Sequence, residues 1–231
     1  MKFLNMAIAA IATALTLNAQ AQEVNYSQEA TSFGTITLGN AQAVRLRIYD
    51  NAQGGQAVKT VQLKKGAPDK NGYPTWATTV KGDLKGKFYT LDVKYKGKYH
   101  GECPGISAKA VGVNGRRGAI VNMAETNPAG WDTDRRPAIA HKDLIIYEMH
   151  HRDFSVSPTS GLVNKGKFLA LTEPRAIAHL KNLGINAVHI LPSFDYASID
   201  ESRLGDGKYN WGYDPLNYNV PEGGYSTDPF N

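Results

Sequence analysis

Apolar and polar residues alternate along the first half of the chain, from residue 31 to about residue 121. In residues 44–49 and again in residues 89–95, every second side chain is apolar. Such alternation is typical of strands that bury one face and expose the other. Clusters of Gly, Asn and Asp separate these segments, and Asn114-Gly115 suits two consecutive positive φ angles at a hairpin turn. The pattern predicts a small all-β, immunoglobulin-like sandwich.

The pattern changes after Glu125. Pro, Gly and Asp residues interrupt any regular element as far as His141, as they do in linkers. Residues 144–147 then form a continuous apolar run, which is typical of a parallel strand buried on both faces. Pro174 suits the first turn of a helix that ends at Gly184, and residues 187–191 form a second apolar run. These elements predict one β-α-β unit.

One β-α-β unit leaves the edges of its sheet uncovered. A complete (β/α)8 TIM barrel needs about 250 residues, many more than follow the linker. We therefore expect the second half of the chain to form only the first β-α-β part of an incomplete barrel. The predicted multidomain organisation is a signal peptide over residues 1–21, the sandwich with its linker over 22–136, and the start of the truncated barrel over 137–231.

The first residues have the composition of a signal peptide. Lys2 is followed by an apolar run over residues 6–17, and Ala19-Gln20-Ala21 matches the small-x-small pattern that precedes cleavage. The run is shorter than the roughly 20 residues of a membrane-spanning helix, so we expect no membrane segment after cleavage. The sequence predicts export to the periplasm, the cell surface or the extracellular space.

Composition and charge exclude several classes of protein. The 42% hydrophobic and 20% charged residues are ordinary for a globular chain, which excludes general disorder and collagen-like repeats. Scattered residues carry the net charge of +5, so no nucleic-acid-binding surface is expected. Cys103 is the single cysteine, and no internal disulfide can form. Stability must therefore come from buried apolar area.

Several motifs follow one another along the chain in a recognisable order. The most specific is Tyr-Asn-Trp-Gly-Tyr-Asp-Pro at residues 209–215, which continues to Gly223. The others are Lys-Gly-Asp-Leu-Lys-Gly-Lys-Phe-Tyr at 81–89, Ala-Val-Gly-Val-Asn-Gly-Arg-Arg-Gly at 110–118, Ile-Tyr-Glu-Met-His-His-Arg-Asp-Phe-Ser at 146–155 and His-Ile-Leu-Pro-Ser-Phe-Asp-Tyr-Ala-Ser at 189–198. From Phe88 onward, the chain resembles the type I pullulanases, debranching enzymes of glycoside hydrolase family 13.

This resemblance implies a fold and an activity. It implies an N-terminal β-sandwich similar to carbohydrate-binding module family 48, followed by the first strands of a catalytic barrel. It also implies retaining hydrolysis of α-1,6-glucosidic bonds in pullulan, starch or glycogen. His151 departs from the pattern, because the family usually has an aliphatic residue there.

The resemblance places the catalytic residues outside this chain. Retaining glycosidases use two carboxylates about 5–5.5 Å apart, and in this family they lie on later barrel strands, beyond residue 231. We therefore predict no catalytic residue here and expect the fragment itself to be inactive. Glu148, Asp153, Asp195 and Asp214 match no family catalytic position, and strand-end or loop hydrogen bonding is the simpler interpretation of these acids.

Part of the substrate cleft remains, in the loop that follows residue 191. By resemblance, Tyr213 stacks under the glucose at the cleaved bond, because an aromatic ring covers the apolar C–H face of a sugar. Asn210, Trp211 and Asp214 would position that ring or bind sugar hydroxyls. The predicted substrate-binding residues are Tyr213, Asp214, Trp211, Asn210, Tyr209 and His150.

No cofactor and no metal ligand are predicted, although the sequence leaves calcium open. His150 and His151 are adjacent, so on a strand they would face opposite ways and could not chelate one ion together. The expected partner is an α-glucan, with no nucleic acid and no evidence of a protein partner.

Two alternatives remain at the level of sequence. In the first, the chain is a non-catalytic α-glucan-binding protein whose sandwich carries an aromatic platform of Trp76, Tyr73, Tyr95 and Tyr99, although Trp76 is more simply a core residue. In the second, weaker alternative, the chain completes a barrel with another chain.

Overall fold

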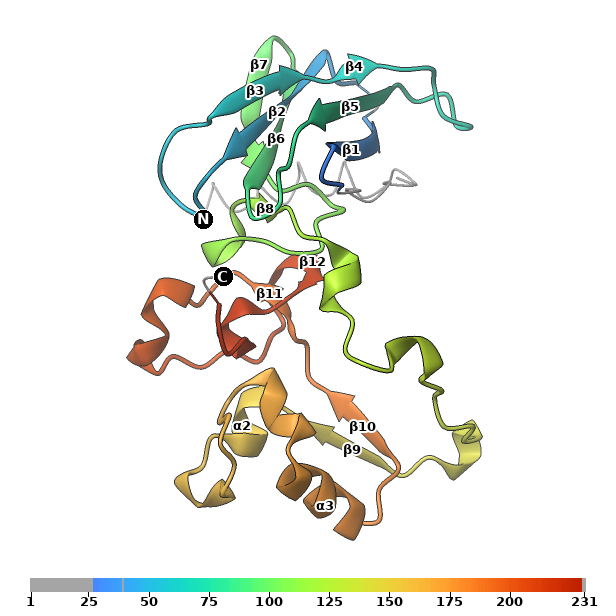
Figure 1. Cartoon of the computed structure of the whole chain (residues 1–231), viewed down its shortest axis with the longest axis vertical. Helices are drawn as coiled ribbons and strands as arrows, with labels where there is room; N and C mark the ends of the chain where they lie inside the picture. Colours follow the sequence, from blue (N-terminus) through green and yellow to red (C-terminus); the bar gives the residue numbers. More distant parts are fainter. Residues whose placement is uncertain (1–26, 39, 230–231) are drawn as a thin grey trace. The chain divides into compact units, whose positions relative to one another are not determined.

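The computed structural model describes residues 27–38 and 40–229. The predicted signal peptide lies outside these residues. The chain divides into two compact units: the first runs to Gly112 and includes Arg116–Asn122, and the second comprises Val113–Gly115 and the residues from Met123 onward (Figure 1). The units thus separate near residue 122, within the segment 22–136 that we predicted as the sandwich together with its linker.

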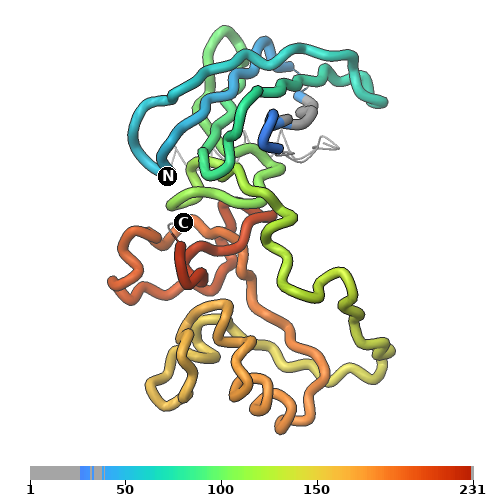
Figure 2. Tube along the Cα trace, viewed as in Figure 1, coloured from blue at the N-terminus to red at the C-terminus, as the bar shows by residue number. Residues whose placement is uncertain are grey.

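Two antiparallel sheets form the first unit. One has the order β1-β5-β4, and the other has the order β3-β2-β6-β7 with β8 paired to β6. The strands are β1 (Ala30–Thr37), β2 (Ala43–Tyr49), β3 (Lys59–Gln62), β4 (Lys64–Lys65), β5 (Thr75–Lys81), β6 (Phe88–Tyr95), β7 (Lys98–Cys103) and β8 (Gly118–Ala119). Figure 2 follows the trace of this unit, in which the central strand β2 pairs with β6 over the whole length of β2.

The two sheets share one hydrophobic core. The apolar residues of β2 expected on the inner face, Val44, Leu46 and Ile48, are fully buried. From the other sheet, Trp76 belongs to the same core and is only 5% exposed. The core interpretation of Trp76 is therefore confirmed, and an aromatic platform that includes it is wrong, because a buried indole offers no surface to a glucan.

The hairpin turn expected at Asn114-Gly115 is present. Both residues have positive φ angles, 60° and 65°. The flanking backbone closes the hairpin, since the Gly112 N–H donates to the Arg117 carbonyl oxygen over 2.8 Å. The local sequence was sufficient to predict this turn, because Asn and Gly tolerate the left-handed region at little cost.

The second unit contains the predicted β-α-β motif. Strands β9 (Ile146–Met149) and β10 (Ala187–Ile190) pair in parallel, with helix α3 (Pro174–Asn182) between them in sequence. The expectation that both strands are buried on both faces is wrong. Ile146 is 60% exposed and Val188 is 39% exposed, because in the described residues this sheet has only two strands.

Shorter elements complete this unit. Helix α2 (His151–Ser155) follows β9, and strands β11 (Phe194–Tyr196) and β12 (Pro215–Pro221) pair antiparallel with irregular register. The 3-10 turns are η1 (Val113–Gly115), η2 (Met123–Thr126), η3 (Trp131–Thr133), η4 (His141–Asp143), η5 (Pro158–Ser160), η6 (Phe168–Thr172), η7 (Glu201–Asp206) and η8 (Gly223–Tyr225). None of the described helices is long and apolar enough to span a membrane.

Candidate functional site

The predicted site residues lie on two loops of the second unit. His150 directly follows β9, and the other five lie between β11 and β12. His150 is buried, and its Nε2 lies 2.9 Å from the Asn210 carbonyl oxygen and 3.0 Å from Tyr225 Oη. The imidazole therefore links the end of a parallel strand to the later loop.

Asn210 holds the loop in one conformation. Its Nδ2 donates to Ser198 Oγ over 2.6 Å and to Asp214 Oδ1 over 2.8 Å. Its Oδ1 accepts the Gly212 N–H over 2.6 Å. The amide thus uses both its donors and its acceptor to shape the turn that carries Tyr213.

Gly212 is required at the centre of this turn. Its φ angle is +88°, and a Cβ atom at this position would lie 2.1 Å from the Pro192 carbonyl oxygen. A backbone oxygen cannot move away as a flexible side chain can. The close approach of residues 192 and 212 therefore explains why glycine separates Trp211 from Tyr213.

Three aromatic side chains of the loop are exposed. Tyr213 is 70% exposed, Trp211 is 60% exposed, and Tyr209 is 41% exposed. The rings of Tyr209 and Trp211 meet edge to face with centroids 5.5 Å apart, and Tyr209 also lies beside the His150 ring at 5.2 Å. Aromatic faces beside hydrogen-bonding groups can cover the apolar face of a sugar. The structure brings the six predicted residues onto neighbouring loops, and their roles in substrate binding stay a prediction.

The sequence argument assumed that His150 and His151 lie on a strand, but neither residue does. Strand β9 ends at Met149, and His151 is the first residue of α2. Both rings pack against Tyr225 rather than pointing in opposite directions. Neither histidine belongs to a group of three or more possible metal ligands within the described residues.

Three acidic residues that the sequence analysis did not combine form a buried cluster. Asp195 on β11, Glu201 on η7 and Glu222 after β12 each offer a carboxylate oxygen, and these oxygens all lie within 4.8 Å of one another. Burial raises the pKa of Glu222 to about 8 and also raises the pKa of Glu201.

The neighbouring backbone encloses this cluster closely. The N–H groups of Tyr196 and Gly224 donate to Glu222 over 3.1 and 2.7 Å, and the Asn114 N–H donates to Glu201 over 2.5 Å. A Cβ at Gly223 would lie 2.2 Å from Glu201 Oε1.

Carboxylate oxygens are the ligands that hard divalent cations prefer, so these three acids are the residues that could hold such an ion. The sequence analysis named no metal ligand, because the three acids come from separate loops and only the fold brings them together.

Hydrogen bonding or ion pairing accounts for three of the four acids that the sequence analysis set aside, as expected. Asp195 accepts the side-chain amide of Asn217 over 2.6 Å, and Asp214 accepts that of Asn210. Glu148 pairs with His189, with 3.1 Å between Oε2 and Nδ1.

Comparison with known proteins shows extensive similarity to one group of enzymes, although no family model matches the chain. The pullulanase of Bacillus subtilis (strain 168) is 34% identical over 198 residues, which cover 82% of this chain and 26% of the relative. The pullulanase of Paenibacillus barengoltzii, solved with maltohexaose and α-cyclodextrin, is 42% identical with a TM-score of 0.83. That match covers 95% of this chain and 34% of the solved chain.

The chain is a homologue of the pullulanases. The resemblance identified from the motifs is thereby confirmed, as is a mostly β-sheet fold with few helices. A further solved structure, the type I pullulanase of Bacillus subtilis str. 168 complexed with maltose, has a TM-score of 0.78 and 31% identity over 96% of this chain. The chain spans only about a quarter to a third of the lengths of these relatives.

Proposed function

We propose that this chain is the N-terminal part of a secreted pullulanase-type enzyme that hydrolyses α-1,6-glucosidic bonds in α-glucans by a retaining mechanism. The observation that carries the proposal is the similarity to pullulanases over 82% of the chain in sequence and 95% in structure. The catalytic carboxylates belong to barrel strands beyond residue 231, so this chain contributes to substrate binding and not to bond cleavage.

The finer architecture belongs to the same proposal. The first unit is an immunoglobulin-like sandwich similar to carbohydrate-binding module family 48, which its two antiparallel sheets with a common core support. The second unit is the start of a (β/α)8 barrel, which the parallel pair β9–β10 and the intervening helix α3 support. Export through the signal peptide at residues 1–21 places the enzyme outside the cytoplasm.

Within the cleft, Tyr213 stacks against the glucose at the cleaved bond. Its 70% exposure leaves the ring accessible, and the hydrogen bonds of Asn210 orient the turn from which it extends. Asp214, Trp211, Tyr209 and His150 complete the substrate-binding surface. Relatives solved with maltotriose, maltose or maltohexaose support an α-glucan as the ligand.

A chimeric enzyme tests this function. Residues 22–231 would replace the matching part of the Paenibacillus barengoltzii pullulanase, and reducing sugar released from pullulan would be measured. We expect activity in the chimera and none in the purified 231-residue chain. Tyr213→Ala in the chimera should lower kcat/KM about 100-fold, a loss of roughly 2.7 kcal/mol of transition-state stabilisation.

The control is Tyr73→Ala, which changes an exposed tyrosine of the first unit and should leave kcat/KM unchanged. A folded but inactive chimera would contradict the proposed function. Release of sugar by the 231-residue chain alone would contradict the proposal that the catalytic acids lie beyond residue 231.

A further inference from the structure

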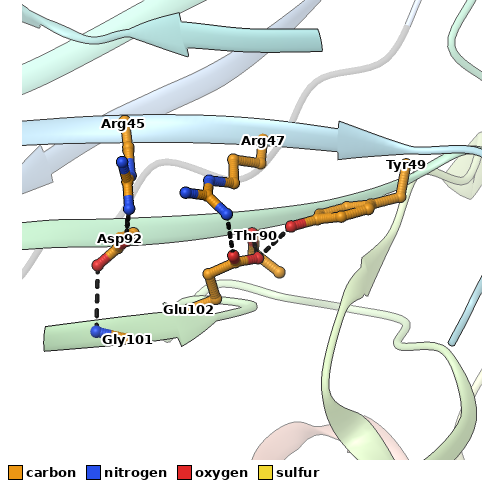
Figure 3. Close-up of polar contacts among 7 residues, drawn as sticks. All are labelled: Arg45, Arg47, Tyr49, Thr90, Asp92, Gly101 and Glu102. Carbon is orange, nitrogen blue, oxygen red and sulfur yellow. Dashed lines mark hydrogen bonds and ion pairs between the residues drawn. The ribbon is translucent and has the colours of Figure 1, made fainter. Parts of the chain in front are cut away.

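The outer face of the second sheet carries a network of charged side chains on strands β2, β6 and β7 (Figure 3). Arg45 pairs with the buried Asp92 over 2.6 Å. Arg47 Nη1 lies 2.5 Å from Glu102 Oε1, and Thr90 Oγ1 donates to Glu102 Oε2 over 2.6 Å. Tyr49 Oη donates to the same carboxylate oxygen. The sequence pattern predicted that this face is polar, but the pairings come from three separate strands.

A pocket of about 460 Å³ opens at one end of this network, within the first unit. Its walls include Arg47, Tyr49 and Glu102 from the sheet and Arg117 from the segment before β8. Residues 55–57, in the loop between β2 and β3, form another side. Two guanidinium groups and one carboxylate therefore line the same pocket.

The carboxylate of Glu102 in this pocket is ionised and accepts several hydrogen bonds from the protein. Burial acts to raise the pKa of Glu102, but hydrogen bonds from Thr90 and Tyr49 and the charges of Arg47 and Arg117 hold it below its ordinary value. Its two oxygens already accept from three side chains. Glu102 consequently has little remaining capacity to accept hydrogen bonds from a ligand.

Hydrogen-bond donors, in contrast, are in excess. A guanidinium carries five N–H donors. Arg117 donates to the Asn51 carbonyl oxygen over 2.6 Å, and Arg47 forms hydrogen bonds with Glu102 and Tyr49, so both side chains keep further N–H donors for a ligand. In the part of the chain that the structure describes, the backbone N–H groups of residues 55–57 have no hydrogen-bond acceptor. The two cations and one anion also leave one net positive charge in the pocket.

The aromatic rings at this face are not available for stacking on a sugar. The Arg117 guanidinium lies 3.5 Å from the centroid of the Tyr49 ring, and Tyr49 is only 4% exposed. Arg45 covers the Tyr99 ring in the same way, at 3.7 Å. A neutral glucan typically stacks on a free aromatic face, and the buried, Arg117-covered ring of Tyr49 offers none in this pocket.

We propose that the pocket formed by Arg47, Arg117, Glu102 and residues 55–57 binds the oxyanion group, phosphate or carboxylate, of a small ligand. Arginine guanidiniums match the planar arrangement of such oxygens and form charge-assisted hydrogen bonds with them. The volume exceeds that of a single phosphate, so an anionic group attached to a small organic molecule also fits. This proposal is independent of the debranching function.

Amide chemical shifts of the 231-residue chain test it. Inorganic phosphate, acetate and maltotriose would be added in separate titrations, with potassium chloride holding the ionic strength constant. We expect phosphate or acetate to shift the amides of residues 55–57 and Arg117, and the comparison of the two anions shows which oxyanion is preferred. Arg117→Gln should weaken that binding about tenfold or more.

The matched control is Arg116→Gln, which removes the same charge from the adjacent, exposed residue outside the pocket and should bind like the parent chain. Equal weakening in both variants would overturn the proposal, as would shifts caused by maltotriose alone. Because the titrations of the parent chain locate the ligand without any substitution, an absence of anion-induced shifts at residues 55–57 would also overturn it.

Discussion

His151 is a histidine in a largely apolar environment. Its ring packs edge to face against Phe168 with centroids 4.7 Å apart and also lies beside Tyr225. Its Nδ1 atom has no hydrogen-bond partner among the described residues. Burial, and then the neighbouring His150, lower the pKa of His151 to about 4. The neutral form is therefore the form that the fold accommodates.

We predict that His151 makes the protein less stable in acid. Between pH 6.5 and pH 4 the unfolded chain binds a proton at this residue that the folded chain does not, so stability falls as pH falls through this window. The lowered pKa of His151 corresponds to a loss on the order of 3 kcal/mol in the free energy of unfolding between these two pH values. His151→Leu should remove this dependence, as measured by urea unfolding at pH 7 and pH 4. His141→Leu, at an exposed position, should retain it, and the same pH profile in both variants would contradict the assignment.

The turn at Gly212 leads to a second prediction about a single residue. Gly212→Ala places a Cβ atom against the Pro192 carbonyl oxygen in addition to the strain of a positive φ angle. Gly207→Ala has a similar φ of +67° but open space around the new atom, so it should cost only about 1–2 kcal/mol. We expect Gly212→Ala to cost clearly more in the free energy of unfolding. Equal costs would mean that the contact with Pro192 does not constrain the loop.

Strand β5 contributes Trp76 to the core shared by the two sheets. Trp76→Ala should destabilise the first unit by about 3–5 kcal/mol, because it removes a large buried side chain and leaves a cavity. Tyr73→Ala, just before the same strand and 39% exposed, should change the free energy of unfolding by about 0.5 kcal/mol or less. Thermal unfolding of both variants and of the parent chain would measure these differences in stability. Similar small effects would place Trp76 outside the core.

Elements with strong local signals were predictable from the sequence. The alternation over residues 44–49 sufficed for β2, and Pro174 marked the first residue of α3. Strands β11 and β12 were not predicted, because they are short or irregular and their register shifts at each pairing. The burial of β9 was predicted incorrectly. An apolar run indicates that a strand is suited to a buried position, but it does not show which neighbouring elements cover the strand.

At the scale of the whole molecule, the two units differ in how well their strands are covered. The central strands β2 and β6 have partners on both sides and contribute to the core. The pair β9–β10 has apolar side chains in contact with solvent, including Ile146 at 60% exposure. Backbone hydrogen bonds in such a poorly covered sheet open more easily.

We therefore predict unequal hydrogen exchange along the 231-residue chain. Amides of β2 and β6 should be strongly protected, whereas amides after residue 140, including those of β9 and β10, should exchange much faster. Mass spectrometry of peptides after exchange would measure the difference. Uniform protection across both units would contradict this prediction, and it would indicate that contacts other than those within the β9–β10 sheet cover these strands.

The sequence by itself determined the features that depend on neighbouring residues: the period-two strands, the left-handed turn at Asn114-Gly115, the start of α3 and the motifs shared with pullulanases. Only the tertiary structure decided which distant residues meet. The cluster of Asp195, Glu201 and Glu222 and the pocket between Arg47 and Arg117 each combine side chains from separate segments. Local propensities act over a few residues, whereas these sites depend on how the strands and loops pack, and a single sequence carries no direct signal of that packing.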